Sequence, residues 1–317
     1  MKKVLIYEAN SNKAISIIKY LKEYTNYEIT EVIENDETIN IENYDYILPI
    51  GADSTYFTLN KYKKLEYCNN ISMTEKELIV FDKPKMLKIA EKININIPKT
   101  YYKKEEIESF PIFYKDDFEK GEGLRGIAKT KEELPENEEL IYQEYIETPS
   151  TYGVGFLAKD GEIITYLQHK EVISYPKVGG SAVVIEKFED ERLLKYTKKL
   201  LKEIDYNGWG LAEFKYCNQR EDFVFMEINS KIWSSIDFML INNPVFLKEL
   251  LNVKYYSKKE KRLLFINYLF RYNFIDILKN LKYLLNSKII KDQSLTYQVV
   301  RRLIPNKLVS QIKRIVK

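Results

Sequence analysis

The chain has 317 residues, of which 45% are apolar and 31% charged, a composition typical of folded proteins with a sizeable core. It has no apolar run of about 18 residues, which excludes a transmembrane helix, and Glu8 follows the start too closely for a signal peptide. Cys68 and Cys217 are the two cysteines and His169 is the one histidine. A disulfide framework and a cysteine metal site are therefore not expected, a multi-histidine metal centre is excluded, and a reducing cytoplasm is expected.

The net charge of +3 is unevenly distributed along the chain. Residues 254–317 hold 16 Lys and Arg against 3 acids, which leaves 34 against 44 in the remainder. A basic tail on an acidic body indicates contact with an acidic face of the same molecule, with an anionic membrane or with nucleic acid. Since no zinc-finger or RNA-binding signature is present, we expect no nucleic-acid partner. A basic helix over 305–317 is predicted to contact protein or the inner membrane face.

The first 80 residues predict a Rossmann-like α/β domain. Short apolar runs over 3–7, 27–32 and 46–51 are typical of buried parallel strands, and 14–21 has the periodicity of an amphipathic helix. The turn over 8–12 contains no glycine, although a dinucleotide-binding turn requires several. We therefore reject an NAD-dependent dehydrogenase.

A helix start and a glycine loop follow this domain. Asp82 and Pro84 predict a capped helix over 82–90. The predicted strand over 110–115 ends at Lys115 and leads into the glycine-bearing segment 121–126. A lysine beside such a loop is suited to binding phosphate, although glycine loops are also ordinary turns.

The second half of the chain predicts an antiparallel sheet and a helix. A strand over 140–146 precedes two strands, 152–158 and 162–168, which Asp160-Gly161 joins as a hairpin turn. A loop over 176–181 and an amphipathic helix over 193–204 come next. Strands over 208–215 and 223–229 then form a second hairpin, and 265–285 predicts one or two apolar helices.

The second hairpin predicts a metal site. If its turn is centred on 217–222, Glu213 faces Glu227, and Asn229 lies on the same face two residues further on. Opposed carboxylates destabilise a sheet unless a positive charge lies between them. Two carboxylates and an amide oxygen are suitable ligands for Mg²⁺. The alternative is a pair of solvated acids on an exposed ribbon.

In this order, the features of residues 1–240 resemble the ATP-grasp superfamily. The resemblance rests on Asp82-Lys83, on Lys115 with its glycine loop, on the hinge Gln143 to Ile146, on Gly179-Gly180-Ser181, and on Met226 to Asn229. It is nearest to the carbamoyl-phosphate-synthetase-like and D-alanine–D-alanine-ligase-like carboxylate–amine ligases. It implies a pre-ATP-grasp domain over 1–80, ATP-grasp subdomains over 81–150 and 151–254, and a separate basic helical region over 255–317.

The resemblance also implies roles for individual residues. The predicted nucleotide-binding residues are Lys83, Lys115, Gly123, Arg125, Gln143, Glu144, Tyr145, Ile146 and His169. The hinge backbone would hold the adenine, while a structural histidine is the alternative reading of His169. Glu213, Glu227 and Asn229 would bind one or two Mg²⁺, with Mn²⁺ as an alternative, and Lys231 and Lys115 would be catalytic.

The activity implied is ligation of a small carboxylate to an amine through an acylphosphate, with a cell-wall or surface-polymer substrate. Three positions depart from the family pattern. Lys231 replaces an arginine, Thr151 stands where an acid holds the ribose, and Glu171 stands near an expected arginine. The departures at Lys231 and Glu171 motivate an alternative, a catalytically altered nucleotide-binding protein with a regulatory or partner-subunit role.

Overall fold

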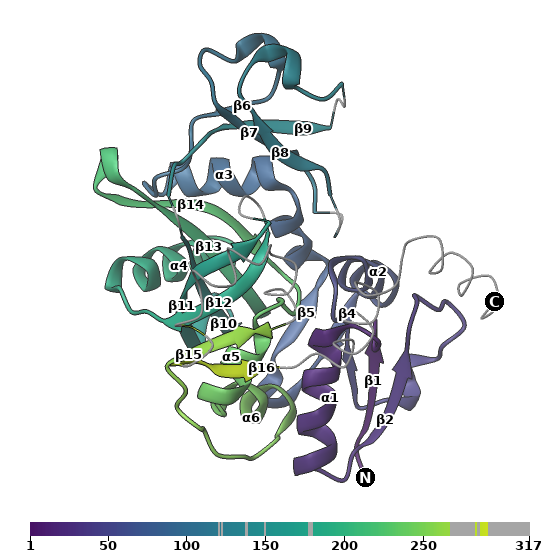
Figure 1. The fold of residues 1–317 in the computed structure, drawn as a ribbon. Coiled ribbons are helices and arrows are strands. Elements are labelled where there is room, and N and C mark those ends of the chain that lie inside the picture. The colour runs from purple at the N-terminus through teal and green to yellow at the C-terminus, as the bar shows by residue number, and fades with distance from the viewer. Residues whose placement is uncertain are drawn as a thin grey trace, which may run out of the picture.

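The computed structural model describes residues 1–119, 121, 123–136, 139–148, 150–176, 180–266, 283 and 286–290. Within these residues the strands form four sheets, and the chain is a mixed α/β protein (Figure 1). The predicted helix over 305–317 and most of the predicted apolar helices over 265–285 lie outside the described residues. In the part described, no helix is long and apolar enough to cross a membrane.

The N-terminal unit is a three-stranded parallel sheet with the strand order β2-β1-β3. The strands are β1 (Lys3–Tyr7), β2 (Glu28–Val32) and β3 (Tyr46–Leu48). The apolar residues of β1 are buried, whereas β2 lies at the edge of the sheet and is partly exposed. Helix α1 (Asn12–Tyr24) follows β1 and α2 (Ala52–Tyr62) follows β3, so both helices begin at the carboxyl edge of this sheet. A two-stranded ribbon, β4 (Lys64–Glu66) with β5 (Ser72–Thr74), completes the unit.

Helix α3 (Lys83–Lys92) leads into a small four-stranded sheet, seen at the top of Figure 1. The Asp82 side chain caps α3 by accepting a hydrogen bond from the Lys85 amide, as the sequence predicts. The sheet order is β6-β9-β7-β8. The strands are β6 (Thr100–Tyr101), β7 (Ile112–Asp116), β8 (Arg125–Ala128) and β9 (Leu140–Glu144).

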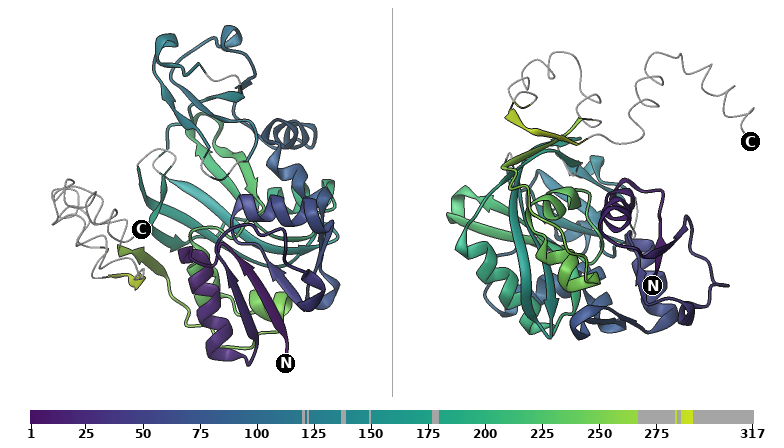
Figure 2. Two further views of the ribbon diagram at one scale, coloured as in Figure 1. Left: turned by 90° about the vertical axis from the view of Figure 1, so that its right-hand side faces the viewer. Right: turned by 90° about the horizontal axis from the view of Figure 1, so that it is seen from below.

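The large sheet has the order β14-β13-β10-β11-β12-β15-β16 and is antiparallel except for its last pair. Its first strands are β10 (Thr151–Lys159), β11 (Glu162–Tyr175) and β12 (Ser181–Lys187), and Asp160-Gly161 joins β10 to β11 as predicted. The others are β13 (Gly208–Cys217), β14 (Asp222–Asn229), β15 (Arg262–Phe265) and β16 (Lys288–Ile290). Helices α4 (Glu191–Glu203), α5 (Ile236–Asn242) and α6 (Val245–Leu251) pack around this sheet (Figure 2).

The β13–β14 hairpin pairs Glu213 with Glu227, so the predicted opposition is confirmed. The pairing depends on a β-bulge. From the turn to Phe214 the register is regular, and it then shifts so that Met226 has no partner on β13. Without this extra residue Glu213 would face Met226 instead. The bulge therefore brings the two carboxylates side by side.

One continuous core joins the N-terminal sheet to the large sheet. Trp209 of β13 is fully buried there and meets the ring of Tyr67 edge-on, with 5.2 Å between the centroids. The buried Glu77 carboxylate accepts hydrogen bonds from the amides of Thr74 and Asn207, which connects β5 with the start of β13. These contacts fix the N-terminal sheet against the hairpin that carries the acidic pair.

Candidate active site

A cavity of about 800 Å³ lies where the small sheet, the large sheet and α1 approach one another. Its lining includes Lys115 from the small sheet, Glu213 and Glu227 from the large sheet, and Lys13 from α1. The size is in the range of small-molecule and cofactor sites. Most of the site residues predicted from the sequence therefore line one common space.

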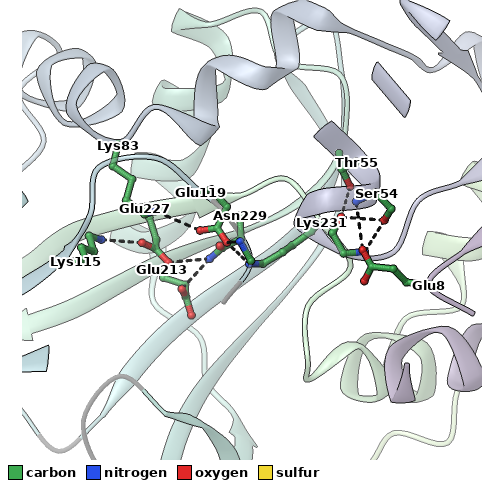
Figure 3. A network of polar contacts seen from close by, with 12 residues as sticks. Glu8, Ser54, Thr55, Lys83, Lys115, Glu119, Glu213, Glu227, Asn229 and Lys231 are labelled. Carbon is green, nitrogen blue, oxygen red and sulfur yellow. Dashed lines mark hydrogen bonds and ion pairs between the residues drawn. The ribbon is translucent and has the colours of Figure 1, made fainter. Parts of the chain in front are cut away.

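The acidic pair on the hairpin is joined to the small sheet by an ion pair (Figure 3). Lys115 Nζ of β7 lies 2.7 Å from Glu227 Oε2 and 3.3 Å from the carbonyl oxygen of Met226. On the other side, Asn229 Nδ2 donates to Glu213 Oε2 at 2.9 Å and to Glu227 Oε1 at 3.2 Å. The two carboxylates are thus held together by an ammonium group and an amide.

The surroundings shift the pKa values of the two acids in opposite directions. Burial raises the pKa of Glu213 well above its usual range, and the neighbouring charge of Glu227 raises it further. Burial alone would raise the pKa of Glu227 too, but the charges of Lys115, Lys83 and Lys231 lower it well below its usual range. Glu227 is therefore ionised, whereas at Glu213 the charge of Lys231 offsets the effect of burial only in part.

These donors fit a divalent cation. The surplus of negative charge lies between Glu213 and Glu227, and Asn229 reaches the same point. Turning the Asn229 amide over would present its oxygen to a cation, since the two ends of an amide have the same shape. Within the described residues no group of three or more His, Cys, Asp or Glu is placed to hold a metal. The site is thus a two-carboxylate, one-amide set, suited to a metal that keeps water and phosphate as its other ligands.

Glu119, which sequence reasoning missed, connects two of the predicted lysines. Its Oε1 lies 2.6 Å from Lys231 Nζ and its Oε2 lies 3.4 Å from Lys83 Nζ. The Glu119 amide donates to the Phe81 carbonyl, which fixes the start of the glycine loop on the segment before α3. One carboxylate thus bridges two ammonium groups in the lining of the cavity and compensates half of their charge. Its position follows from the fold and has no motif of its own.

The hinge residues Glu144, Tyr145 and Ile146 line the cavity. The Glu144 carboxylate accepts hydrogen bonds from the Lys99 amide at 2.9 Å and from Arg220 Nη2 at 2.5 Å, which ties β9 to the β13–β14 turn. Since this side chain is engaged, the backbone is the part of Glu144 left to meet a ligand. Gln143 does not line the cavity: it is fully buried and donates to the Thr100 hydroxyl.

Gly123 and Arg125 line the cavity at the end of the glycine loop. Asp116, at the end of β7, holds this loop: its amide donates to the Leu124 carbonyl, and its carboxylate accepts from the Leu124 amide at 3.1 Å. A Cβ atom on Gly123 would lie 2.7 Å from Asp116 Oδ2. Glycine at this position therefore allows the loop to lie directly on the buried carboxylate.

His169 does not reach the cavity. It is 3% exposed, its ring covers Gly153 of the neighbouring strand, and it meets Phe238 edge-on. Its Nε2 is buried without a hydrogen-bond partner, and burial lowers the pKa of the imidazole to about 4. This placement matches the structural reading of His169 and removes it from direct contact with a ligand in the cavity.

The far end of the cavity is lined by residues that the sequence did not single out. They come from the start of α1 and from residues 232–235, in the segment between β14 and α5 that also contains the predicted Lys231. Trp233 in this segment is 4% exposed and packs over Gly155 of β10. Glu171 and Lys215 line the opposite end, where burial raises the pKa of Glu171 to about 7.

Comparison of the fold with solved structures gives many matches, whereas neither a protein-family model nor a curated protein sequence matches the chain. Biotin carboxylase from Campylobacter jejuni, in its β-γ-ATP complex, matches at a TM-score of 0.59 with 14% identity over 83% of this chain and 74% of that one. A putative ATP-grasp superfamily protein from Archaeoglobus fulgidus matches at a TM-score of 0.57 with 14% identity. The match covers 80% of this chain and 90% of that one.

Pyruvate carboxylase from Rhizobium etli matches at a TM-score of 0.59 with 11% identity over 78% of this chain, which spans 28% of that longer protein. The protein therefore has an ATP-grasp fold, as the sequence motifs predict.

Proposed function

We propose that the chain is an ATP- and Mg²⁺-dependent ligase that joins a carboxylate to an amine through an acylphosphate. The observation that carries this proposal is the convergence of Lys83 and Lys115 on the opposed Glu213 and Glu227 at one wall of the cavity. Phosphoryl transfer is catalysed chiefly by positioning and by neutralising charge on the phosphates. Ammonium groups and a bound divalent cation provide both.

ATP would lie with its base at the hinge and its phosphates at the lysines. Ile146, Met226 and Phe113 give the hinge end an apolar lining, suited to a flat base whose edge meets the backbone of 144–146. Lys83, Lys115 and Arg125 lie toward the phosphate end. The similarity to a biotin carboxylase whose structure contains an ATP compound supports a nucleotide as the ligand.

Glu213, Glu227 and Asn229 would hold Mg²⁺, which when bound supplies positive charge to the phosphate oxygens. Lys115 keeps Glu227 ionised and in place, and Lys83 and Lys115 would bind the α- and β-phosphates. The substrate carboxylate then forms a bond to the terminal phosphorus as the bond to ADP breaks. The amine attacks the resulting acyl carbon, loses a proton and expels phosphate, so no protein nucleophile is needed.

Lys231 would act at the junction between the phosphates and the second substrate. It keeps the charge of the arginine that the family resemblance implies, but it lacks the two-pronged hydrogen-bonding geometry. A cell-wall or surface-polymer substrate, and a location at the inner membrane face, belong to the same proposal and rest on the branch resemblance and the basic C-terminal composition.

The test is release of ADP and phosphate from ATP in the presence of pooled amino acids and small amines. We expect release that depends on Mg²⁺, that Glu227→Gln reduces at least 100-fold, and that Glu203→Gln, on an exposed face of α4, leaves unchanged. Tight ATP binding without release under any pool would instead favour the nucleotide-binding regulator. Failure to bind ATP at all would reject both functions.

A further inference from the structure

A loop over 252–261 connects α6 with β15 on the surface of the protein (Figure 1). Its residues alternate at the start: Val253 and Tyr255 are buried in the core, whereas Lys254 and Tyr256 are exposed. Tyr256 is 94% exposed, more than any other large hydrophobic side chain in the described part of the chain. A single exposed ring is common on protein surfaces, so the surroundings of Tyr256 decide what this loop can bind.

Contacts with α1 and α5 hold the loop on the protein. The ring of Tyr255 packs against two rings of α1, with 4.7 Å between its centroid and that of Tyr20 and 5.5 Å to that of Tyr24. The Lys258 amide and the Ser257 hydroxyl donate to carbonyl oxygens at the end of α5, at 3.0 and 3.1 Å. The exposed side chains therefore project from a loop that is itself packed and hydrogen-bonded.

Four exposed lysines lie within five residues of Tyr256, namely Lys254, Lys258, Lys259 and Lys261. None of them forms an ion pair or a side-chain hydrogen bond with a residue that the structure describes. In contrast, Lys248 of the preceding helix pairs with Glu249 at 3.0 Å. The one acid of the loop is Glu260, which is half-buried. The loop therefore presents a concentrated positive charge to solvent, with an aromatic ring in its middle.

The residue types of this surface favour an anionic lipid surface as the partner. Lysines attract negatively charged headgroups, and each one near a membrane strengthens binding about fivefold. Tyrosine is enriched at membrane interfaces, where its ring meets lipid while its hydroxyl stays in water. Protein interfaces are depleted in lysine and enriched in arginine, and this loop contains no arginine. Nucleic acids are commonly bound through arginine forks or several stacked rings, which the loop also lacks.

We infer that the loop over 252–261 docks on an anionic phospholipid surface, with its lysines at the headgroups and the ring of Tyr256 in the interfacial layer. This inference rests on the proposed function for the membrane location alone, and it needs no ligase reaction. It assigns that location to a surface of the described fold, separate from the predicted basic helix over 305–317.

Docking through this loop would leave the cavity open. The loop contacts α1 near the end of that helix, through Tyr24, whereas Lys13 at the start of α1 lines the cavity. At a rise of 1.5 Å per residue, the step from Lys13 to Tyr24 corresponds to about 16 Å. Binding of ATP should therefore not depend on binding of the membrane.

The experiment is co-sedimentation of the full-length protein with vesicles. Vesicles of phosphatidylcholine and phosphatidylglycerol in equal amounts are compared with vesicles of phosphatidylcholine alone. We expect binding to the anionic vesicles only, and release at about 0.5 M salt because salt screens the lysines. Lys254→Gln combined with Lys258→Gln should weaken binding at least tenfold, and Tyr256→Ser at least threefold.

Matched substitutions test whether the position of these residues matters. Lys92→Gln combined with Lys202→Gln removes two lysines whose side chains are 74% and 77% exposed, and should leave vesicle binding unchanged. Tyr166→Ser, at a tyrosine of β11 that is 40% exposed, is the aromatic control and should also have no effect. Lys254→Arg combined with Lys258→Arg should bind as the wild type does, which separates loss of charge from loss of folding.

Equal vesicle binding by the wild type and the loop variants would overturn the inference, because the contact would then come from another part of the chain. No binding by the wild type, or equal binding to both kinds of vesicle, would overturn it too. Polyuridylate and polyglutamate are titrated in parallel: loop variants that weaken binding of either polymer but not of vesicles would identify a nucleic acid or an acidic protein as the partner instead. ATP binding and ADP release are recorded without vesicles, so their absence in the wild type would count against the ligase and not against the membrane contact.

Discussion

Glu119 Oε1 lies 2.6 Å from Lys231 Nζ, while the other oxygen of the same carboxylate lies 3.4 Å from Lys83 Nζ (Figure 3). One acid thus occupies the position in front of two lysines that are expected to meet phosphate and substrate. The side chain of Glu119 is 14% exposed, so solvent screens these pairs only weakly. Any anion entering the cavity has to share the two lysines with it.

Glu119→Gln should therefore tighten the binding of metal-free ATP. Removing a negative charge near the phosphates lowers repulsion by about 1 kcal/mol, or roughly fivefold in Kd. Nucleotide titration of the two proteins at low salt measures the change. Glu108→Gln is the control, because Glu108 is an exposed acid that pairs with Lys99 near the small sheet. This substitution should not alter the Kd. Weaker binding in Glu119→Gln would mean that the carboxylate chiefly positions the lysines.

Lys115→Met should destabilise the fold because it leaves Glu227 beside Glu213 without its cation. A cost of about 2 kcal/mol is expected, below the loss typical of a fully buried pair, since the Glu227 side chain is 21% exposed. The lowered pKa of Glu227 contributes stability above the unfolded-state pKa, and that contribution is lost as pH falls. The difference in unfolding free energy between the wild type and Lys115→Met should thus become smaller as the pH is lowered.

Urea unfolding of both proteins at several pH values measures this difference in unfolding free energy. Adding Glu227→Gln to Lys115→Met removes the unpaired charge and should recover at least half of the lost stability. If the double variant were no more stable than Lys115→Met, the ion pair would not be the cause of the loss.

His169 should stay neutral well below the usual pKa of histidine. Its pKa of about 4 in the fold, against about 6.5 when unfolded, means that the unfolded chain binds the proton first as pH falls. Folding stability should therefore drop by up to about 3 kcal/mol between pH 6.5 and 4. Because the chain has one histidine, its imidazole resonances can be followed by NMR without assignment.

His169→Phe should remove this part of the acid sensitivity. Its free energy of unfolding should vary less between pH 6.5 and 4 than that of the wild type. An imidazole that titrates near pH 6.5 in the folded protein would contradict the buried position of His169.

Gly123→Ala should weaken ATP binding without unfolding the protein. The new methyl group would lie 2.7 Å from Asp116 Oδ2, so either the loop or the carboxylate has to move. We expect at least a fivefold rise in the Kd for ATP and a change in unfolding free energy below about 1 kcal/mol, as is usual away from a core. Asp116→Ser provides the matched test: combined with Gly123→Ala it makes room for the methyl group and should restore part of the affinity.

Much of the site could be predicted from residue types and their order. The cap at Asp82, the turn at Asp160-Gly161 and the two strands that carry Glu213 and Glu227 depend on local chemistry and on residue pattern, which a sequence displays. The pairing of the two acids nevertheless needs the bulge at Met226, and no residue pattern indicates that bulge.

The missed residues share one physical cause. Glu119, Lys13 and Asp237 reach the cavity only because separate elements pack together, so nothing adjacent in the sequence marks them. Gln143 and His169 show the reverse case: the strands predicted to carry them form, but their side chains turn into the core. The Rossmann-like description of the first 80 residues, the domain boundaries and the basic C-terminal helix stay predictions.

The two tryptophans of the chain, Trp209 and Trp233, both belong to the core that joins the N-terminal sheet to the large sheet. Trp233 also lines the cavity, near Lys231, whereas Trp209 does not. Trp233 is therefore a natural fluorescence probe of the cavity. In Trp209→Phe the remaining indole emission would come from the cavity alone, so ligand arrival at Lys231 could be followed in real time without a label.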